Sequence, residues 1–132
     1  MATTTANITL SSADLTGDAL SLTQTSTLTK AGTATGLDQT SGVGRKTTTA
    51  NTIYTLFTAA DYTADKAHKV YLRNTSSTAT EFFTVTVNSQ EVGEIYAGDW
   101  AFFPWTATTG ADIKITPSVA TSMTLEYMII FE

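Results

Sequence analysis

The chain has 132 residues, of which 42% are hydrophobic, 10% aromatic and only 14% charged. This length fits a single domain, and the absence of cysteine excludes disulfides and cysteine-ligated metal sites. The net charge of −5, with seven scattered Lys and Arg residues, argues against a nucleic-acid partner. No apolar run is long enough to span a membrane, and the first residues lack the features of a signal peptide. We therefore expect no membrane partner and no export.

Threonine is the most unusual feature of the composition, with 30 residues in the chain. Its β-branched side chain favours strands, and its hydroxyl group suits the solvent-facing side of a sheet. No segment shows the apolar spacing of an amphipathic helix. The sequence therefore predicts an all-β fold, in the form of a jelly-roll-like two-sheet β-sandwich with an extended N-terminal arm.

The composition changes near residue 50. Residues 1–50 are rich in Ala, Ser, Thr and Gly and contain no aromatic residue, whereas residues 51–132 contain all 13 aromatic residues. We predict an N-terminal arm over residues 1–50, with short strands and a Gly-rich loop, and a β-sandwich core over residues 51–132. A disordered low-complexity arm is the alternative. An ordered arm so poor in large side chains is instead expected to be held by a neighbouring chain.

Alternation of apolar and polar residues predicts the strands. In the arm it predicts short strands at 8–10 and 19–23 joined by a turn at 14–18, and a long loop over 30–46. Asn88-Ser89-Gln90 is predicted to be a hairpin turn. Seven strands are predicted in the second part, at residues 53–57, 70–73, 82–87, 92–96, 100–105, 113–116 and 124–131.

The search for catalytic chemistry finds no convincing motif. His68 is the single histidine and is interpreted as a solvated turn residue, because Ser and Asp are too plentiful for a triad match to carry information. Residues 42–47 come close to two phosphate-binding motifs. Arg45 stands where a P-loop needs glycine, and Thr47 stands where a dinucleotide motif needs its third glycine. A flexible loop ending in a small basic patch is the preferred interpretation.

The carboxylates and glycosylation motifs are equally uninformative. The Asp61–Asp65 segment lacks the ligand spacing and the glycine of a calcium loop, and a possible acid/base role for Glu91 and Glu94 depends on a separation that sequence cannot give. The glycosylation patterns that start at Asn7 and Asn74 are expected by chance in a threonine-rich chain. We predict no enzyme, no cofactor and no metal site.

An aromatic cluster between Tyr96 and Trp105 is the feature that stands out. On a strand, Trp100 and Phe102 face one side while Phe103 and Trp105 face the other. The C-terminal strand is apolar on both faces too, which indicates either a central strand or a protein interface. A sugar-stacking platform is a third interpretation. As interface candidates we select Ile8, Leu10, Leu20, Leu22, Arg45, Lys46, Tyr96, Trp100, Phe103, Trp105, Met128 and Ile130.

Three stretches carry a resemblance to a known group of proteins. They are VYLRNTS at residues 70–76, GEIYAGDWAFFPW at residues 93–105, and the opening TLTKAGTATGLDQTSGVGRKTTT at residues 27–49. Together they resemble the small Thr/Ser-rich structural proteins of tailed bacteriophages of cyanophage or marine-phage type.

The resemblance implies a virion component made in the host cytoplasm. It implies a capsid decoration (cement) protein on the exterior of the head, which contacts the major capsid protein or another virion protein and forms a homo-oligomer, with a trimer favoured. The alternative is a tail, neck or fibre component with a receptor- or carbohydrate-binding β-sandwich. We expect deletion of residues 1–30 to leave a folded domain that no longer binds the particle.

Overall fold

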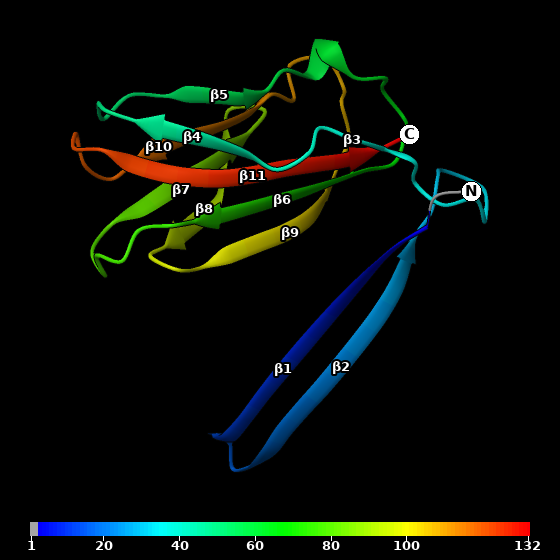
Figure 1. Cartoon of the computed structure of the whole chain (residues 1–132), viewed down its shortest axis with the longest axis horizontal. Helices are drawn as coiled ribbons and strands as arrows, with labels where there is room; N and C mark the ends of the chain where they lie inside the picture. The colour runs from blue at the N-terminus through cyan, green and yellow to red at the C-terminus, as the bar shows by residue number, and fades with distance from the viewer. Residues whose placement is uncertain (1–2) are drawn as a thin grey trace.

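The chain forms eleven strands and one short 3-10 helix in a computed structural model that describes residues 3–132. A long β-hairpin leads into a two-sheet sandwich (Figure 1). The elements in chain order are β1 (Thr4–Thr16), β2 (Asp18–Leu28), β3 (Gln39–Thr40), β4 (Gly44–Thr48), β5 (Tyr54–Phe57), η1 (Ala59–Asp61), β6 (His68–Asn74), β7 (Phe82–Val87), β8 (Gln90–Tyr96), β9 (Trp100–Trp105), β10 (Ile113–Pro117) and β11 (Met123–Phe131).

The sandwich has the strand order of an eight-stranded jelly roll. One sheet runs β4-β11-β6-β9, with β3 continuing β4 along the same edge of β11, and the other runs β5-β10-β7-β8. If the eight strands are numbered from β4, the first sheet has the order 1-8-3-6 and the second has the order 2-7-4-5. This is the arrangement of a jelly roll. All strand pairs are antiparallel. The all-β sandwich predicted from the sequence is therefore confirmed.

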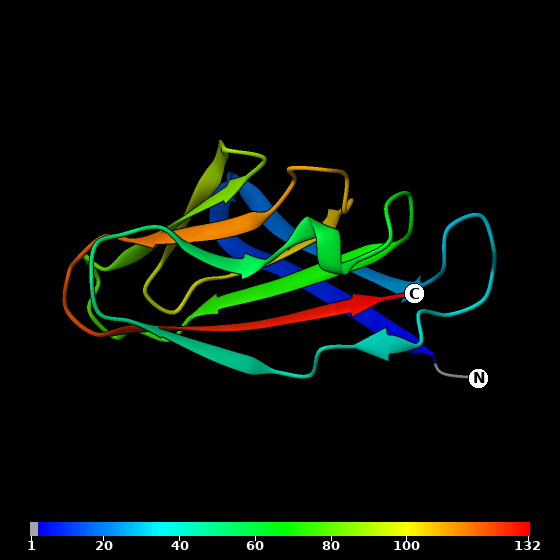
Figure 2. The same cartoon turned by 90° about the horizontal axis from the view of Figure 1, so that it is seen from above.

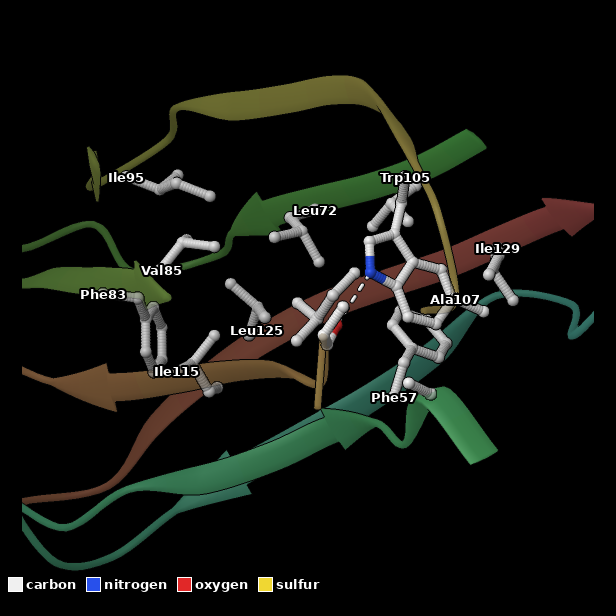
Figure 3. Close-up of a cluster of buried hydrophobic side chains, with 14 of the residues drawn as sticks. Phe57, Leu72, Phe83, Val85, Ile95, Trp105, Ala107, Ile115, Leu125 and Ile129 are labelled. Atoms are coloured by element: carbon white, nitrogen blue, oxygen red, sulfur yellow. Dashed lines mark hydrogen bonds between the residues drawn. The ribbon is translucent and has the colours of Figure 1, made fainter. Parts of the chain in front are cut away.

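The core lies between the two sheets and follows the period-2 alternation of each strand. In β6 and β10, every second side chain is buried, among them Leu72 and Ile115, and β11 adds Leu125 and Ile129 to the same core. Trp105 closes one end of the core, where its indole N–H donates a hydrogen bond of 2.8 Å to the carbonyl of Ala111 (Figure 3). Burial of the ring and satisfaction of its one donor together fix the end of β9.

Asn74 is the main buried polar side chain of the sandwich. Its Nδ2 donates to the carbonyls of Glu81 (3.1 Å) and Ile95 (3.0 Å), and its Oδ1 accepts from the backbone N–H of Ser76 (3.0 Å). The side chain therefore joins the end of β6 to the following loop and to β8. Because Asn74 is fully buried, it is not an accessible glycosylation acceptor.

The seven strands predicted beyond residue 50 are confirmed, with ends that differ by a few residues. The turn between β7 and β8 is also confirmed, since Asn88 and Ser89 both have positive φ, at 51° and 60°, as a type I′ hairpin requires. His68 was predicted to be a solvated turn residue, and this is wrong. It begins β6, is 1% exposed, and lies among the rings of Tyr62, Trp105 and Phe131.

The first 50 residues are more ordered than the alternation predicts. The two short strands predicted there extend into a 13-residue and an 11-residue strand that form one hairpin. Part of the predicted loop over residues 30–46, namely residues 39–40 in β3 and 44–46 in β4, pairs with β11. The sandwich therefore begins near residue 39 rather than at 51.

Candidate interaction surface

The β1–β2 hairpin has two chemically distinct faces. Register pairs such as Thr9 with Thr23 place only hydroxyl and amide side chains on one face. The opposite face carries Leu10 paired with Leu22, and Ile8 beside them. That face also carries the polar residues Thr4, Ser12, Gln24 and Ser26, but it holds every large apolar side chain of the paired segment, which makes the hairpin an amphipathic ribbon. The polar face consists of Thr5, Asn7, Thr9, Ser11, Ser21, Thr23, Thr25 and Thr27, all exposed.

The base of the hairpin packs on the sandwich through its apolar face. Leu28 and Leu37 are buried with Ile130 in a small second core, against which Ala6, Phe102 and Met128 also pack. Met128 and Ile130 were selected as interface candidates, and here they receive the chain's own arm. The intramolecular contact covers only the part of the ribbon nearest the sandwich.

Polar contacts fix the loop that follows the hairpin. Lys30 Nζ lies 2.6 Å from a carboxylate oxygen of Asp38. The Glu132 carboxylate accepts hydrogen bonds from the backbone N–H groups of Ala31 (3.3 Å) and Ala67 (3.1 Å). Desolvation would raise the pKa of Glu132, but these two donors and the nearby Lys66 and Lys30 outweigh it and lower the pKa. The carboxylate is thereby held in its charged form, and it ties the arm loop to the sandwich.

The outer face of the β4-β11-β6-β9 sheet is unusually apolar for a solvent-facing surface. Register places Phe102, Tyr71 and Met128 in one row across β9, β6 and β11. The next row holds Trp100 and Arg73, followed by Glu126. Trp100 is 54% exposed. Tyr71 donates a hydrogen bond of 3.2 Å to Glu126, and desolvation together with that carboxylate raises its pKa.

A groove separates the hairpin from this outer face. The groove has a volume of about 560 Å³. Its hairpin side includes Ile8 and Leu28, and its sheet side includes Tyr71, Trp100 and Phe102. In Figure 2, the hairpin runs obliquely to the strands of this sheet, and in Figure 1 it diverges from β9 towards its tip. We call this feature the arm groove.

The distal half of the hairpin has no cover in the part of the chain that the structure describes. Leu10 is 52% exposed and Leu22 is 40% exposed, although they form a cross-strand pair on the apolar face. Leu20 lies on the same face and is half-buried. We call Leu10, Leu20 and Leu22 the distal leucines. An isolated two-stranded hairpin is only marginally stable in water, so a projecting ribbon of this kind gains from a partner.

The remaining interface candidates are dispersed. Trp105 is buried in the core, and Phe103 is half-buried and packs against that core. Tyr96 is exposed on the other sheet, where its hydroxyl donates to Glu94. Arg45 lies 3.3 Å from Glu126, and Lys46 lies over the ring of Tyr54. Of the interface candidates, Ile8, Trp100, Met128 and Ile130 thus line the arm groove together, while the distal leucines lie farther out on the same face of the hairpin.

Three residues that line this site were not among the interface candidates predicted from the sequence. Tyr71, Arg73 and Phe102 face the groove. Alternation in the sequence does place Tyr71 and Arg73 on one face of β6, because Val70 and Leu72 occupy the opposite, buried face. Alternation alone could not show that Phe102 and Trp100 on β9 lie beside them.

Metal-binding side chains do not cluster in residues 3–132. No group of three or more His, Asp or Glu side chains there is arranged to hold a metal ion. Asp61 ends η1, Asp65 lies in a turn with φ of 60°, and residues 44–48 form a strand rather than a phosphate-binding loop. His68 Nδ1 lies 2.9 Å from the carbonyl of Lys66, which is a structural contact.

Comparison with known proteins adds no relative. No family model matches the sequence, and no curated protein and no solved structure shows significant similarity to it. Within the described residues, no helix has the length and apolar character that crossing a membrane requires. The arm, the groove and the outer face of the sheet are therefore the features that bear on function.

Proposed function

We propose that the chain is a non-enzymatic structural protein of a bacteriophage virion, a capsid decoration protein that stabilises the exterior of the head as a homo-oligomer. One observation carries the proposal: the amphipathic hairpin projects from the sandwich with Leu10 and Leu22 paired on its apolar face and exposed. Such a surface is suited to a neighbouring protein rather than to a small substrate.

The chemistry of the two hairpin faces supports this role. The polar face, with Thr9, Thr23 and their neighbours, remains compatible with water when the opposite face is covered. A net charge of −5 suits a protein that faces solvent rather than packaged DNA. The jelly roll is a fold that viral capsid proteins use repeatedly, but a fold does not by itself imply a function.

The mechanism is stabilisation by mass action. A protein that binds the closed shell but not its opened form shifts the equilibrium towards the closed shell, by an amount that grows with its occupancy. The hairpin supplies apolar contact area at a distance from the sandwich, so that one chain can contact neighbours on a curved surface. No catalytic group is needed for this.

The proposal is tested on particles produced from the genome that encodes the chain. We expect peptides of this chain in gradient-purified particles at a copy number comparable to that of the major shell protein, and antibody labelling on the outside of the head. Absence of the chain from purified particles would refute the proposal. Labelling confined to the tail would transfer the chain to the tail, neck or fibre alternative.

A second candidate, a carbohydrate-binding module on a fibre, is favoured by one observation. Trp100 is 54% exposed beside Tyr71 and Phe102, and exposed aromatic rings are surfaces on which sugars stack. Because Trp105, the other tryptophan, is buried in the core, a fluorescence change on adding glycans would report on Trp100. We expect no shift or quenching across a glycan panel. Saturable quenching that Trp100→Ala removes would favour the carbohydrate-binding role.

A further inference from the structure

We propose that the distal half of the hairpin of one copy docks in the arm groove of a second copy, so that the chains are joined by exchanged arms. This inference names a partner for the surface on which the proposed function rests. It is carried by the juxtaposition of two incomplete apolar surfaces, the distal leucines and the half-covered outer face around Trp100 and Tyr71.

The contact within one chain supplies the template for the contact between chains. At its base, the apolar face of the ribbon already packs on this outer face, where Leu28 and Ala6 contact Ile130, Phe102 and Met128. The distal leucines continue the same face of the same ribbon. The groove continues past Phe102 to Trp100, where the sheet is uncovered. A second hairpin laid along the groove would therefore extend an existing mode of packing rather than require a new one.

Charge favours the same arrangement. The hairpin carries Asp14 and Asp18 near its turn and no Lys or Arg over residues 3–28. The outer face presents Arg73 and Lys69 on β6 and Arg45 on β4. Its carboxylate at Glu126 is already engaged by Arg45 and by the hydroxyl of Tyr71. The opposite charges of the acidic hairpin tip and the mainly basic sheet face attract the two surfaces and orient them as they approach.

The contact is heterologous, because a tip meets a groove rather than another tip. Repetition of such a contact by a closing rotation generates a ring, and a ring leaves no distal leucine and no groove exposed. Hairpins packed against each other through their leucines, or a hairpin bound only by a shell protein, are the other occupants that the test must separate.

The test compares two matched pairs of variants, double substitutions in the hairpin and single substitutions for the groove, by light scattering of the purified full-length chain. Leu10→Asp with Leu22→Asp changes the apolar face, and Thr9→Asp with Thr23→Asp makes the same charge change one residue along on the polar face. For the groove, Trp100→Asp is matched by Val92→Asp, since Val92 is 62% exposed on β8 of the other sheet. All four proteins should keep the wild-type thermal unfolding midpoint of the sandwich to within a few degrees.

We expect the wild-type chain to have a mass that is a small whole-number multiple of 14.0 kDa, with three copies matching the trimer expected from the resemblance. The leucine and Trp100 variants should be monomeric, with self-association weakened about 100-fold or more, while both controls assemble. A mixture of the leucine variant with the Trp100 variant should regain a dimer, because one intact tip and one intact groove then meet.

Three results would overturn the proposal. The first is a wild-type chain that is monomeric at high micromolar concentration, and the second is a leucine variant that keeps the wild-type mass. The third is a mixture of the two variants that fails to regain the dimer. This third result is the one expected if hairpins pack against each other. Particle binding is measured separately. A chain that is monomeric but still decorates particles would refute the arm exchange and leave the proposed function standing. A chain that forms the oligomer but is absent from particles would refute the proposed function and leave the arm exchange standing.

Discussion

Deletion of residues 1–30 is expected to leave a cooperatively folded sandwich that no longer attaches to the particle. All eight jelly-roll strands, β4 to β11, follow the deleted segment, so neither sheet loses a strand. The packing that is lost is that of Leu28 and Ala6 on the second core. Burial of one leucine side chain contributes about 2 kcal/mol, which a domain of this size can lose and remain folded.

Attachment should fail because the deletion removes every distal leucine together with the hairpin side of the arm groove. The measurement is co-sedimentation with particles that lack the chain, alongside a urea titration that confirms folding. The Thr9→Asp, Thr23→Asp protein serves as the control, because it keeps the apolar face while its polar face is altered. Full occupancy by the truncated chain would show that the sandwich alone binds and that the arm has no part in attachment.

The second large effect is expected from Asn74→Ala. The substitution leaves the carbonyls of Glu81 and Ile95 and the N–H of Ser76 without the hydrogen bonds that the Asn74 side chain provides. Because the site is fully buried, water cannot replace them without entering the sandwich. The free energy of unfolding should fall by about 2–4 kcal/mol.

Urea denaturation followed by fluorescence measures this loss, and Asn51→Ala is the matched control. Asn51 is exposed and makes a single long hydrogen bond of 3.4 Å to the carbonyl of Ser118, so its loss should cost less than about 1 kcal/mol. Equal effects of the two substitutions would mean that Asn74 is not the polar junction described above.

The strands beyond residue 50 could be predicted because their side chains reveal which face is buried. In β7, Phe83 and Val85 are buried while Phe82, Thr84 and Thr86 are only partly so, and the period of two is visible in the letters. Trp105 and Phe103 were correctly placed on the face opposite Trp100 and Phe102 for the same reason. Alternation is a local property, so a local pattern is enough to find it.

The edge strand β4 was missed because its contacts are made with residues far along the chain. Gly44 lies against the ring of Tyr127, where an added Cβ would be 2.9 Å from the ring, so the small residue is required by close packing with β11. In the sequence, the same glycine suggested a flexible loop. His68 was misplaced for a related reason, since its burial depends on Trp105 and Phe131 from two other strands.

The arm was predicted as an element but not as a projecting ribbon. Its strands pair with each other over most of their length, from Thr4 with Leu28 to Ser12 with Leu20. Small side chains at Ala6 and Ser26 weaken the apolar signal of one face, which made the predicted strands too short. The placement of Ile8 and Trp100 around one groove depends on tertiary structure, which no local pattern encodes.

The most direct measurement is an electron cryomicroscopy reconstruction of particles assembled with this chain. The account predicts jelly-roll density on the outer surface of the head, with the β1–β2 hairpin of each copy lying on a neighbouring molecule and its distal leucines covered. A head surface without this density, or density in which the hairpin projects freely into solvent, would contradict the account.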